Sequence, residues 1–525
     1  MAKGIKRVIR IGHGKLTLED VVAVARYQSE VRLTKEAKVA IQKSRAYVEK
    51  LLDENRVVYG LTTGFGKFSD TLISREDTQA LQYNLIRSHA CGVGEAFAEE
   101  IVRAMILLRV NALALGYSGI RLETVERLIS LLNQGVTPVV PEKGSLGASG
   151  DLAPLAHLAL VLIGEGEAFY GGKRLPGGEA LRLAGIEPVS LKAKEGLALI
   201  NGTQVMTAVA ALSIWDALNL ADWADSAAAL TFEALHGIKD ALDPESHRIR
   251  PHQGQGEVAA HLRSLTEGSG LISRQGELRV QDAYSLRCIP QVHGASRDVF
   301  AYIAEKVRIE MNSVTDNPLI FADEDRVISG GNFHGQPIAL AMDFLSISAA
   351  ELANIAERRL ERLVNPQLNE NLPPFLTEHG GMSSGFMIAQ YAAASLVSEN
   401  KTLAHPASVD SIPSSGNQED HVSMGTIAAR KARQIVENAY YVVAIELLAA
   451  AQAVDFRGPE KLGQGTHKVY EICRGQATFV AEDRVLSGDF EKVAHFLRAT
   501  QASAILGIQE QTTNMDWQRA ALTST

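Results

Sequence analysis

The sequence predicts a mainly α protein, a long-helix bundle with a smaller mixed N-terminal lobe. Apolar residues recur at helical spacing in long runs after position 200, and strand-like alternation is scarce. A content of 46% hydrophobic residues with only 16 prolines among 525 residues suits a large buried core. We therefore expect an N-terminal lobe over residues 1–200, followed by a long-helix bundle and C-terminal helices over residues 201–525.

The lobe begins with two amphipathic helices, expected over residues 16–27 and 35–52 with Thr17 and Thr34 as N-caps. Residues 57–70, VVYGLTTGFGKFSD, carry three glycines among aromatic residues. This composition fits a loop that moves over a site, and equally a packed connecting loop. Helical spacing returns at residues 81–88, 97–115 and 122–132.

The second part of the chain is dominated by long helical patterns. They cover residues 204–235, 299–311, 338–363, 384–403 and 424–453. Strands are expected to be short and confined to the first two hundred residues or to hairpins such as FADEDRVISG, residues 321–330. Apolar seams on such long helices usually pair with other chains, so we expect a symmetric oligomer.

Charge and cysteine usage narrow the class of function. A formal net charge of −9 offers no large basic surface for nucleic acid, so a small polar ligand is the expected partner. The three cysteines are widely separated and form neither a disulfide framework nor a zinc pattern, which fits a reducing compartment. The N-terminus lacks a secretory h-region, and the most apolar stretches fall short of, or interrupt, the roughly 20 residues of a membrane span. We expect a cytoplasmic protein without membrane contact.

One stretch has an unusual composition: GSLGASGDLAPLAHLALVLIGEG, residues 144–166, in which small residues run into an apolar helical pattern. Asp151 is the expected N-cap of that helix. The glycines argue for an uncommon backbone geometry, because each one costs conformational entropy on folding. An anion cradle is a weak interpretation, since the run lacks the P-loop lysine and the spacing of a dinucleotide fingerprint.

A second interpretation is that the backbone itself reacts. If the amide nitrogen of Gly150 attacks the carbonyl carbon of Ala148, a five-membered ring closes, and loss of water from Ser149 leaves an exocyclic methylidene. Glycine supplies an unhindered nitrogen, alanine an accessible carbonyl, and serine the hydroxyl that is lost. For an arbitrary Ala-Ser-Gly a glycine-rich surface turn is by far the commoner explanation, so its neighbours must decide.

Several distant residues could take part in such chemistry. Gln281, Tyr284 and Arg287 would share one helix face before Pro290 ends the helix, and an arginine fork suits a carboxylate, although a structural ion pair is the commoner fate. Asn201 would open the long helix as an N-cap. Three more candidates have ordinary structural explanations as well: Tyr59, a base if its pKa is lowered, His89 and Glu419.

Together these motifs resemble the aromatic amino acid ammonia-lyase family. The resemblance rests on GSLGASGDLAPLAH, YGLTTGFG, LINGTQ, QDAYSLR, SVTDNPL, GGNFHGQP and NQEDHVSMG, which span nearly the whole chain. It implies a mainly α homotetramer with active sites drawn from several subunits. It also implies a 4-methylideneimidazol-5-one electrophile formed autocatalytically from Ala148, Ser149 and Gly150, with no metal or nucleotide.

Within that family the chain most resembles the histidine-specific lyases. The signs are SHACGVGE at residues 88–95, GKFSD at 66–70, FLTEHGG at 375–381 and NQEDHVSM at 417–424. The implied reaction converts L-histidine to trans-urocanate and ammonia. Thr62, within YGLTTGFG, is the form familiar from phenylalanine and tyrosine lyases, which keeps those substrates, and an aminomutase, as alternatives. An inactive helical scaffold is the alternative that is not an enzyme.

The resemblance also implies a role for each site residue. Tyr59 removes the β-proton of the substrate, Arg287 binds its carboxylate, and His89 and Glu419 hydrogen-bond its imidazole ring. Other residues orient the electrophile or close its pocket; these are Asn201, Tyr284 and Phe333, with Gln281 and Glu310 as further candidates.

Overall fold

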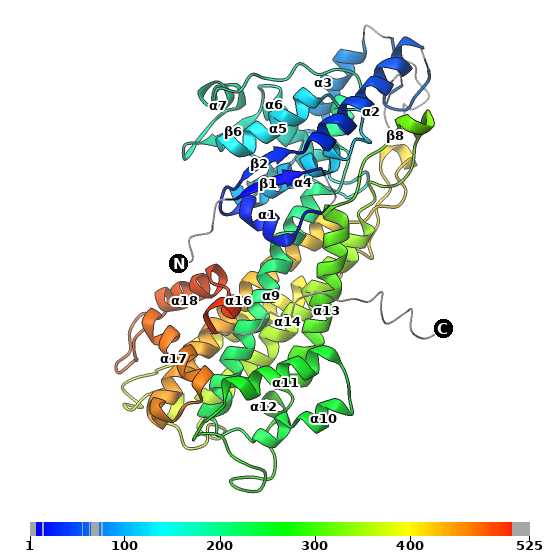
Figure 1. Cartoon of the computed structure of the whole chain (residues 1–525). Helices are drawn as coiled ribbons and strands as arrows, with labels where there is room; N and C mark the ends of the chain where they lie inside the picture. Colours follow the sequence, from blue (N-terminus) through cyan, green and yellow to red (C-terminus); the bar gives the residue numbers. More distant parts are fainter. Residues whose placement is uncertain are drawn as a thin grey trace. The chain divides into compact units, whose positions relative to one another are not determined.

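The structure is a computed structural model that describes residues 7–12, 15–54, 56–61, 63–64, 73–74 and 77–506 (Figure 1). The chain forms two compact units, each assembled from three stretches. The first unit comprises Met1–Ser213, Ala304–Asp343 and His405–Arg433, and the second comprises Ile214–Ile303, Phe344–Ala404 and Gln434–Thr525. The division expected at residue 200 follows chain order, whereas in the structure two later stretches return to the first unit.

The first two helices of the first unit begin at the N-caps that the sequence predicts. Thr17 and Asp20 exchange hydrogen bonds in a capping box at the start of α1 (Leu18–Ala25), and Thr34 caps α2 (Lys35–Asp53). Both predicted N-caps are confirmed. The remaining helices are α3 (Thr78–His89), α4 (Glu99–Ala114), α5 (Leu122–Gln134), α6 (Leu152–Leu162), α7 (Gly177–Leu183) and α8 (Glu195–Ile200).

The strands in the described part of the chain are all four residues long or shorter, as expected. β1 (Val8–Ile11) pairs in parallel with β2 (Glu30–Leu33), and Val8 lies opposite Glu30. The other pairs are antiparallel. They join β3 (Val93–Ala96) to β5 (Pro141–Lys143), β4 (Thr137–Pro138) to β6 (Glu167–Tyr170), β6 to β7 (Lys173–Pro176), and β8 (Leu319–Phe321) to β9 (Arg326–Ile328).

Five long helices confirm the mainly α prediction: α9 (Gln204–Ala234), α13 (Ile289–Met311), α14 (Gln336–Val364), α15 (Met387–Leu403) and α16 (Gly425–Arg457). Four of the five boundaries between the units fall inside α9, α13, α14 and α16. Shorter helices complete the second unit: α10 (Pro244–Arg248), α11 (Gln253–Leu265), α12 (Tyr284–Arg287), α17 (Gln464–Gln476), α18 (Ser487–Ala499) and α19 (Ala502–Leu506). Single 3₁₀ turns lie at Lys239–Leu242, Ala322–Glu324, Pro374–Leu376, Ser415–Asn417 and Pro459–Lys461.

Three of the apolar helices are long enough to span a membrane. By length and composition α9, α14 and α16 could each cross a membrane, which corrects the expectation that the apolar stretches are too short. Their most apolar windows are 89%, 67% and 83% buried inside the protein. Helices that are apolar on most sides are typical of a large protein core as well as of a membrane.

The segment around Arg287 differs from its prediction. Helix α12 has only four residues, Tyr284–Arg287, and Gln281 precedes it in irregular backbone. Pro290 stands in the first turn of α13 rather than at the end of a helix. A proline lacks a backbone N–H and tolerates a first turn, where that donor has no intrahelical partner, so the same residue that can stop a helix here begins one.

A buried charge network ties the long helices of the second unit together. Asp225 on α9 accepts hydrogen bonds from His293 Nδ1 on α13 and from Arg297, both at 2.6 Å. Arg359 on α14 donates to His293 Nε2 at 3.2 Å and pairs with Glu446 on α16 at 2.5 and 2.9 Å. Arginine only donates, so His293 Nε2 accepts, and the ring is neutral with its proton on Nδ1.

The surroundings of His293 and Asp225 determine the protonation states of these two side chains. Burial lowers the pKa of His293, and this effect exceeds the opposing hydrogen bond to Asp225. Burial alone would raise the pKa of Asp225, but the charge of Arg297 and the two hydrogen bonds from histidines hold it well below its ordinary value. The folded protein therefore keeps a carboxylate beside a neutral imidazole.

We expect the free energy of unfolding to fall as the pH falls below about 6.5, the ordinary pKa of histidine. The pKa of His293 is lower in the folded chain than in the unfolded chain, so unfolding takes up a proton in this range. Each such proton lowers the free energy of unfolding by about 1.4 kcal/mol per pH unit. Denaturant unfolding at a series of pH values measures the slope.

The control separates His293 from other titrating groups. His293→Asn retains a donor facing Asp225 but does not titrate, so we expect a slope smaller by about one proton. His495→Asn, on the exposed side of α18, is expected to leave the slope unchanged. An unaltered slope in His293→Asn would contradict the assignment.

Candidate active site

The glycine-rich run before α6 is held on its upstream side by a segment far along the chain. Ser423 donates from its hydroxyl and its backbone N–H to the carbonyl of Gly147, at 3.1 and 3.2 Å. The N–H of Met424 donates to the carbonyl of Leu146 at 3.2 Å. A Cβ on Gly147 would lie 2.3 Å from Ser423 Oγ, so only glycine permits this approach.

On its downstream side the run lies against the loop between α8 and α9. Gly150 and Gly202 form a β-bridge, and the N–H of Asp151 donates to the carbonyl of Gly202 at 2.8 Å. A Cβ on Gly150 would lie 2.2 Å from that carbonyl oxygen, and φ of Gly150 is +70°. Ala148, Ser149 and Gly150 are therefore fixed at both ends, and each end depends on a backbone contact that a side chain would block.

Asp151 occupies the N-cap position of α6, as predicted, but its side chain caps a different helix. Its carboxylate accepts from the N–H groups of Val205 and Met206, at 3.0 and 2.9 Å, in the first turn of α9. It also accepts from the hydroxyls of Ser145, at 2.8 Å, and Thr426. The prediction that Asp151 caps α6 with its side chain is wrong, because the fully buried carboxylate finds more donors in α9.

Glu419 contacts the serine of the tripeptide. Ser149 Oγ donates to Glu419 Oε1 at 3.0 Å, and Ser414 Oγ donates to Oε2 at 3.1 Å. Backbone pairing between Ser414 and Glu419 fixes the turn that carries the carboxylate. Ser149 and Glu419 are 270 positions apart in the sequence, so their contact could not be predicted from sequence spacing.

His89 ends α3 with a defined tautomer. Ser88 Oγ donates its one proton to the carbonyl of Leu85 at 3.1 Å, so it accepts from His89 Nδ1 at 3.0 Å. Burial lowers the pKa of His89, against smaller opposing effects of the Leu85 carbonyl and the charge of Glu419. The neutral ring thus carries its proton on Nδ1, and Nε2 is an acceptor.

Asn201 lies between α8 and α9 as the C-cap residue of α8, so the prediction that it caps the long helix is wrong. It is 3% exposed, and Arg109 donates to its carbonyl at 2.9 Å. Asn201 Oδ1 has no hydrogen-bond partner among the described residues. Nearby, Glu310 accepts from the hydroxyl of Thr203 at 2.6 Å, and burial raises the pKa of Glu310.

Tyr59 is half-buried in a turn that is anchored on both sides. Val58 and Leu61 are 8% and 1% exposed and pack in a cluster with Tyr47 and Ile320. The described part of the predicted mobile loop is therefore fastened to the first unit. Thr62 and the GKFSD stretch, residues 66–70, lie outside the described residues.

Phe333 is half-buried in the turn before α14. The next residue, His334, stacks on His421 with ring centroids 5.8 Å apart, and its Nε2 lies 3.3 Å from the carbonyl of His421. This contact brings the segment of Phe333 to the segment of Glu419. Part of the predicted site lies in the first unit: Tyr59, His89, Ala148, Ser149, Gly150, Asn201, Glu310, Phe333 and Glu419.

The remaining predicted residues belong to the second unit. Gln281 is exposed, Tyr284 is 70% exposed, and the guanidinium of Arg287 lies 4.6 Å from the centre of the Tyr284 ring. Within the described residues, Arg287 Nε is buried without a hydrogen-bond partner. These three residues adjoin one another in the chain, but the described contacts do not join them to the tripeptide.

The sequence analysis missed several residues that hold the tripeptide and Asn201. Gly202, Ser423 and Thr426 were not singled out, and only the close contacts reveal them. Arg109 did leave a signal in the sequence, because a charged residue within the apolar run of α4 is seldom buried without a reason. It is fully buried.

Comparison with known proteins identifies the family. A model of the family described as aromatic amino acid lyase matches residues 16–475. The chain belongs to the aromatic amino acid lyase family. It is 61% identical over 489 residues to a histidine ammonia-lyase of Alkaliphilus oremlandii, covering 93% of this chain and 96% of that protein.

Solved structures of this lyase family have the same fold. A histidine ammonia-lyase from Trypanosoma cruzi is 44% identical with a TM-score of 0.89, and 95% of each chain is covered. A tyrosine aminomutase from Streptomyces globisporus is 41% identical with a TM-score of 0.92, covering 95% of this chain and 98% of that one. The backbone alone therefore does not separate these activities.

We expect Gly202→Ala to lower the free energy of unfolding by about 1–3 kcal/mol or more, because overpacking strains a close contact. The new Cβ would lie 2.3 Å from Arg109 Nη1 and from Gln204 Oε1. Gly256→Ala in α11 meets no atom within 4 Å and should stabilise by about 0.5–1 kcal/mol. Denaturant unfolding compares the two variants, and equal stability would contradict the close approach at Gly202.

Proposed function

We propose that the protein is a histidine ammonia-lyase, which deaminates L-histidine without oxidation to trans-urocanate and ammonia. The observation that carries the proposal is Glu419, whose carboxylate lies 3.0 Å from Ser149 Oγ and whose charge acts on His89. These groups put hydrogen-bonding partners for an imidazole ring beside the tripeptide. The identity of 61% to a curated histidine ammonia-lyase supports the same substrate.

The specificity follows from two acceptors. His89 Nε2 and the Glu419 carboxylate both accept hydrogen bonds, and an imidazole ring offers N–H donors. A phenyl ring would leave both acceptors unpaired, at a cost of roughly 1–3 kcal/mol each. The phenol of tyrosine and a neutral imidazole each have a single donor, whereas the imidazolium form of histidine has two, so a protonated histidine ring satisfies both acceptors. Histidine is therefore the substrate that the pair favours.

The proposed cofactor is a 4-methylideneimidazol-5-one formed from Ala148, Ser149 and Gly150. It would supply an electrophile that converts the substrate amino group into a leaving group. The residues present fit this group, because glycine is required at 150 and 202 by close backbone contact, and the buried Oδ1 of Asn201 lacks a partner among the described residues. No step of the proposal requires a metal or nucleotide.

The other residues have roles that concern the substrate. Tyr59 takes the β-proton, for which its hydroxyl must be deprotonated. Arg287 binds the carboxylate, for which a bidentate guanidinium is suited. Further residues orient the reacting groups: Asn201, Tyr284, Phe333, Gln281 and Glu310.

The protein is proposed to act in the cytoplasm as a homotetramer with sites shared between subunits. Leu340, Phe344 and Ile347 form an outward apolar stripe on α14 and are 38%, 41% and 52% exposed. Contiguous exposed apolar residues are typical of a protein interface. Tyr284, 70% exposed in the single chain, is then available to a site in a neighbouring subunit.

A tyrosine aminomutase is the second candidate, because such an enzyme, 41% identical to this chain, has the same fold. We expect L-histidine to be consumed at least about 100-fold faster, by kcat/KM, than L-phenylalanine, which would leave both acceptors unpaired, and at least about tenfold faster than L-tyrosine, which would leave one unpaired. The chain mass should lie below that of the sequence by two water molecules. A preference for tyrosine would refute the substrate, and an unmodified mass would refute the ring and favour an inactive scaffold.

Two variants separate turnover from ring formation. Tyr59→Phe should retain the mass deficit while kcat falls by about 10²–10⁴-fold, the usual contribution of a general base. Glu419→Gln keeps the side-chain size but removes the carboxylate, and should lower kcat/KM for L-histidine by at least about tenfold with the deficit retained. Asp420→Asn, next to it and exposed, is the control. Near-normal turnover in Tyr59→Phe would remove that tyrosine from the mechanism.

A further inference from the structure

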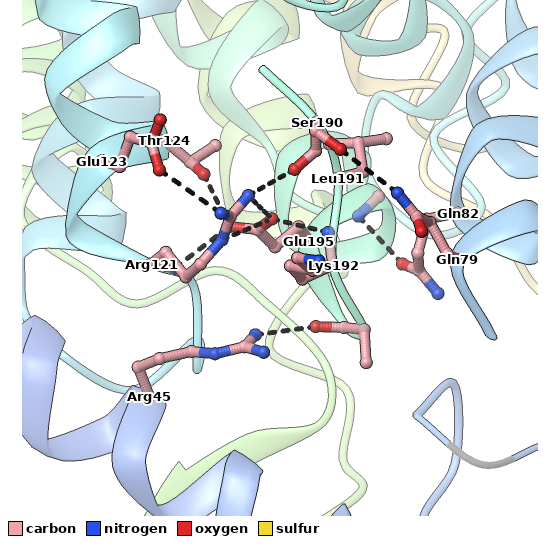
Figure 2. Close-up of polar contacts among 12 residues, drawn as sticks. Arg45, Gln79, Gln82, Arg121, Glu123, Thr124, Ser190, Leu191, Lys192 and Glu195 are labelled. Atoms are coloured by element: carbon pink, nitrogen blue, oxygen red, sulfur yellow. Dashed lines mark hydrogen bonds and ion pairs between the residues drawn. The ribbon is translucent and has the colours of Figure 1, made fainter. Parts of the chain in front are cut away.

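The segment from Ser190 to Gly196, which leads into α8, is tied to its surroundings along its whole length (Figure 2). The fully buried carboxylate of Glu195 accepts from Arg121, at 2.7 Å for Nη2, from Thr124 Oγ1 at 2.6 Å and from the N–H of Lys192 at 2.8 Å. Arg45 donates to the carbonyl of residue 193 at 2.9 Å, and Gln79 and Gln82 bind either end. This segment therefore has one well-determined backbone path.

Lys194 stands in the middle of that path in a strained conformation. Its φ is +73°, in the left-handed region that favours glycine, and its side chain is 1% exposed. Outliers of this kind persist only where the surrounding structure determines them, and they cluster at functional sites. The hydrogen bonds of Glu195 and Arg45 hold the backbone of Lys194 in this conformation.

The ammonium of Lys194 shares a single carboxylate with a second buried cation. Lys194 Nζ lies 3.3 Å from Asp316 Oδ2, and Arg109 Nη2 lies 3.9 Å from the same oxygen. All three side chains are within 1% of full burial. Two cations against one carboxylate leave a net positive charge in the interior of the first unit.

This positive charge adjoins the backbone of the proposed site. Arg109 Nη1 donates to the carbonyl of Asn201 at 2.9 Å, and a Cβ on Gly202 would lie 2.3 Å from the same nitrogen. Beyond Gly202 lie the carboxyl groups of Asp151 and Glu310, and burial raises the pKa of both. Burial also lowers the pKa of Lys194 and of Arg109, and the charge of Asp316 opposes that effect. The excess cation is thus one peptide away from the contact between Gly202 and Gly150.

Stability does not account for Lys194. A buried ammonium loses its hydration, and its strained backbone costs more, while Asp316 already has Arg109 and the N–H of Asn317 as partners. A methionine of similar volume would avoid the desolvation. Because the buried ammonium of Lys194 lowers the stability of the fold, we explain its presence by the effect of its charge on neighbouring groups.

We propose that Lys194 is a positioning residue whose charge, acting through Asp316 and Arg109, keeps a positive potential at the Asn201–Gly202 backbone. That potential stabilises the negative charge that the proposed reaction places on the group built from Ala148, Ser149 and Gly150. The inference rests on the proposed function. Preorganised charge in a water-excluded site is a major source of rate enhancement, because it needs no reorganisation during the reaction.

The test removes the charge while keeping the volume. In Lys194→Met we expect the chain to retain its mass deficit, its Tm to stay equal or rise, kcat for L-histidine to fall by about tenfold or more, and KM to change less than about threefold. Lys192→Met, two positions away with an exposed side chain, is the control and should match the wild type. A stabilised chain with lower kcat is an outcome that a structural ion pair does not produce.

A second variant keeps the proposal testable if Lys194→Met does not fold. It also separates the effect of the charge of Lys194 from the effect of its hydrogen bond. Lys194→Gln can still donate to Asp316 but is neutral, so we expect the same fall in kcat as in Lys194→Met. Wild-type kcat in Lys194→Gln would overturn the proposal. So would a kcat within about twofold of wild type in Lys194→Met, a lower Tm with activity lost in proportion, or loss of the mass deficit, which would assign Lys194 to maturation.

Turnover by the wild-type chain shows whether the role of Lys194 or the proposed function itself is refuted. If the wild-type chain forms no product from L-histidine, the proposed function is refuted. If the wild type turns over normally and the Lys194 variants do so too, only the role of Lys194 is refuted.

Discussion

The fully buried carboxylate of Asp151 holds together three stretches of chain that the sequence keeps far apart. It binds Ser145 on its own loop, the first turn of α9, and Thr426 at the start of α16. Burial raises its pKa, and four hydrogen bonds oppose that effect. Because these donors come from all three sides, the adjacent tripeptide cannot move without breaking the start of α9 or the 423–426 segment.

Local signals explain how much of the fold the sequence predicts. Helical spacing and the caps at Thr17 and Thr34 depend on residues within four positions, so the first two helices and the long helices were predictable. The sequence analysis did not single out α7, α8 or most of the short helices of the second unit. Gln281 and Pro290 show the limit, since a spacing of three is compatible with a helix but does not require one, and a proline suits a helix start as well as its end. Tertiary contacts decided both cases.

The site was predictable as a set of residue types and not as a geometry. The small residues of the tripeptide and the carboxylate of Glu419 stand out through their chemistry, yet their 3.0 Å contact joins positions 270 apart. Asp151 was read as a cap for the helix that follows it, because local sequence shows only the nearest donors. The sequence analysis did not single out Lys194, and only its burial and positive φ distinguish it. These features depend on contacts between residues far apart in the sequence, which local patterns do not contain.

The first unit is assembled from three stretches that are separated in the sequence, and this has a consequence for biosynthesis. Its loop at residues 144–150 leaves the ribosome early, but Ser423 and Thr426, which hold it, belong to the last stretch of the unit. At about 5–20 residues per second, Thr426 follows Asp151 by roughly 15–55 s. A nascent chain therefore lacks the contacts of the loop with Ser423 and Thr426 until those residues have been synthesised, and the backbone geometry around the tripeptide is completed only then.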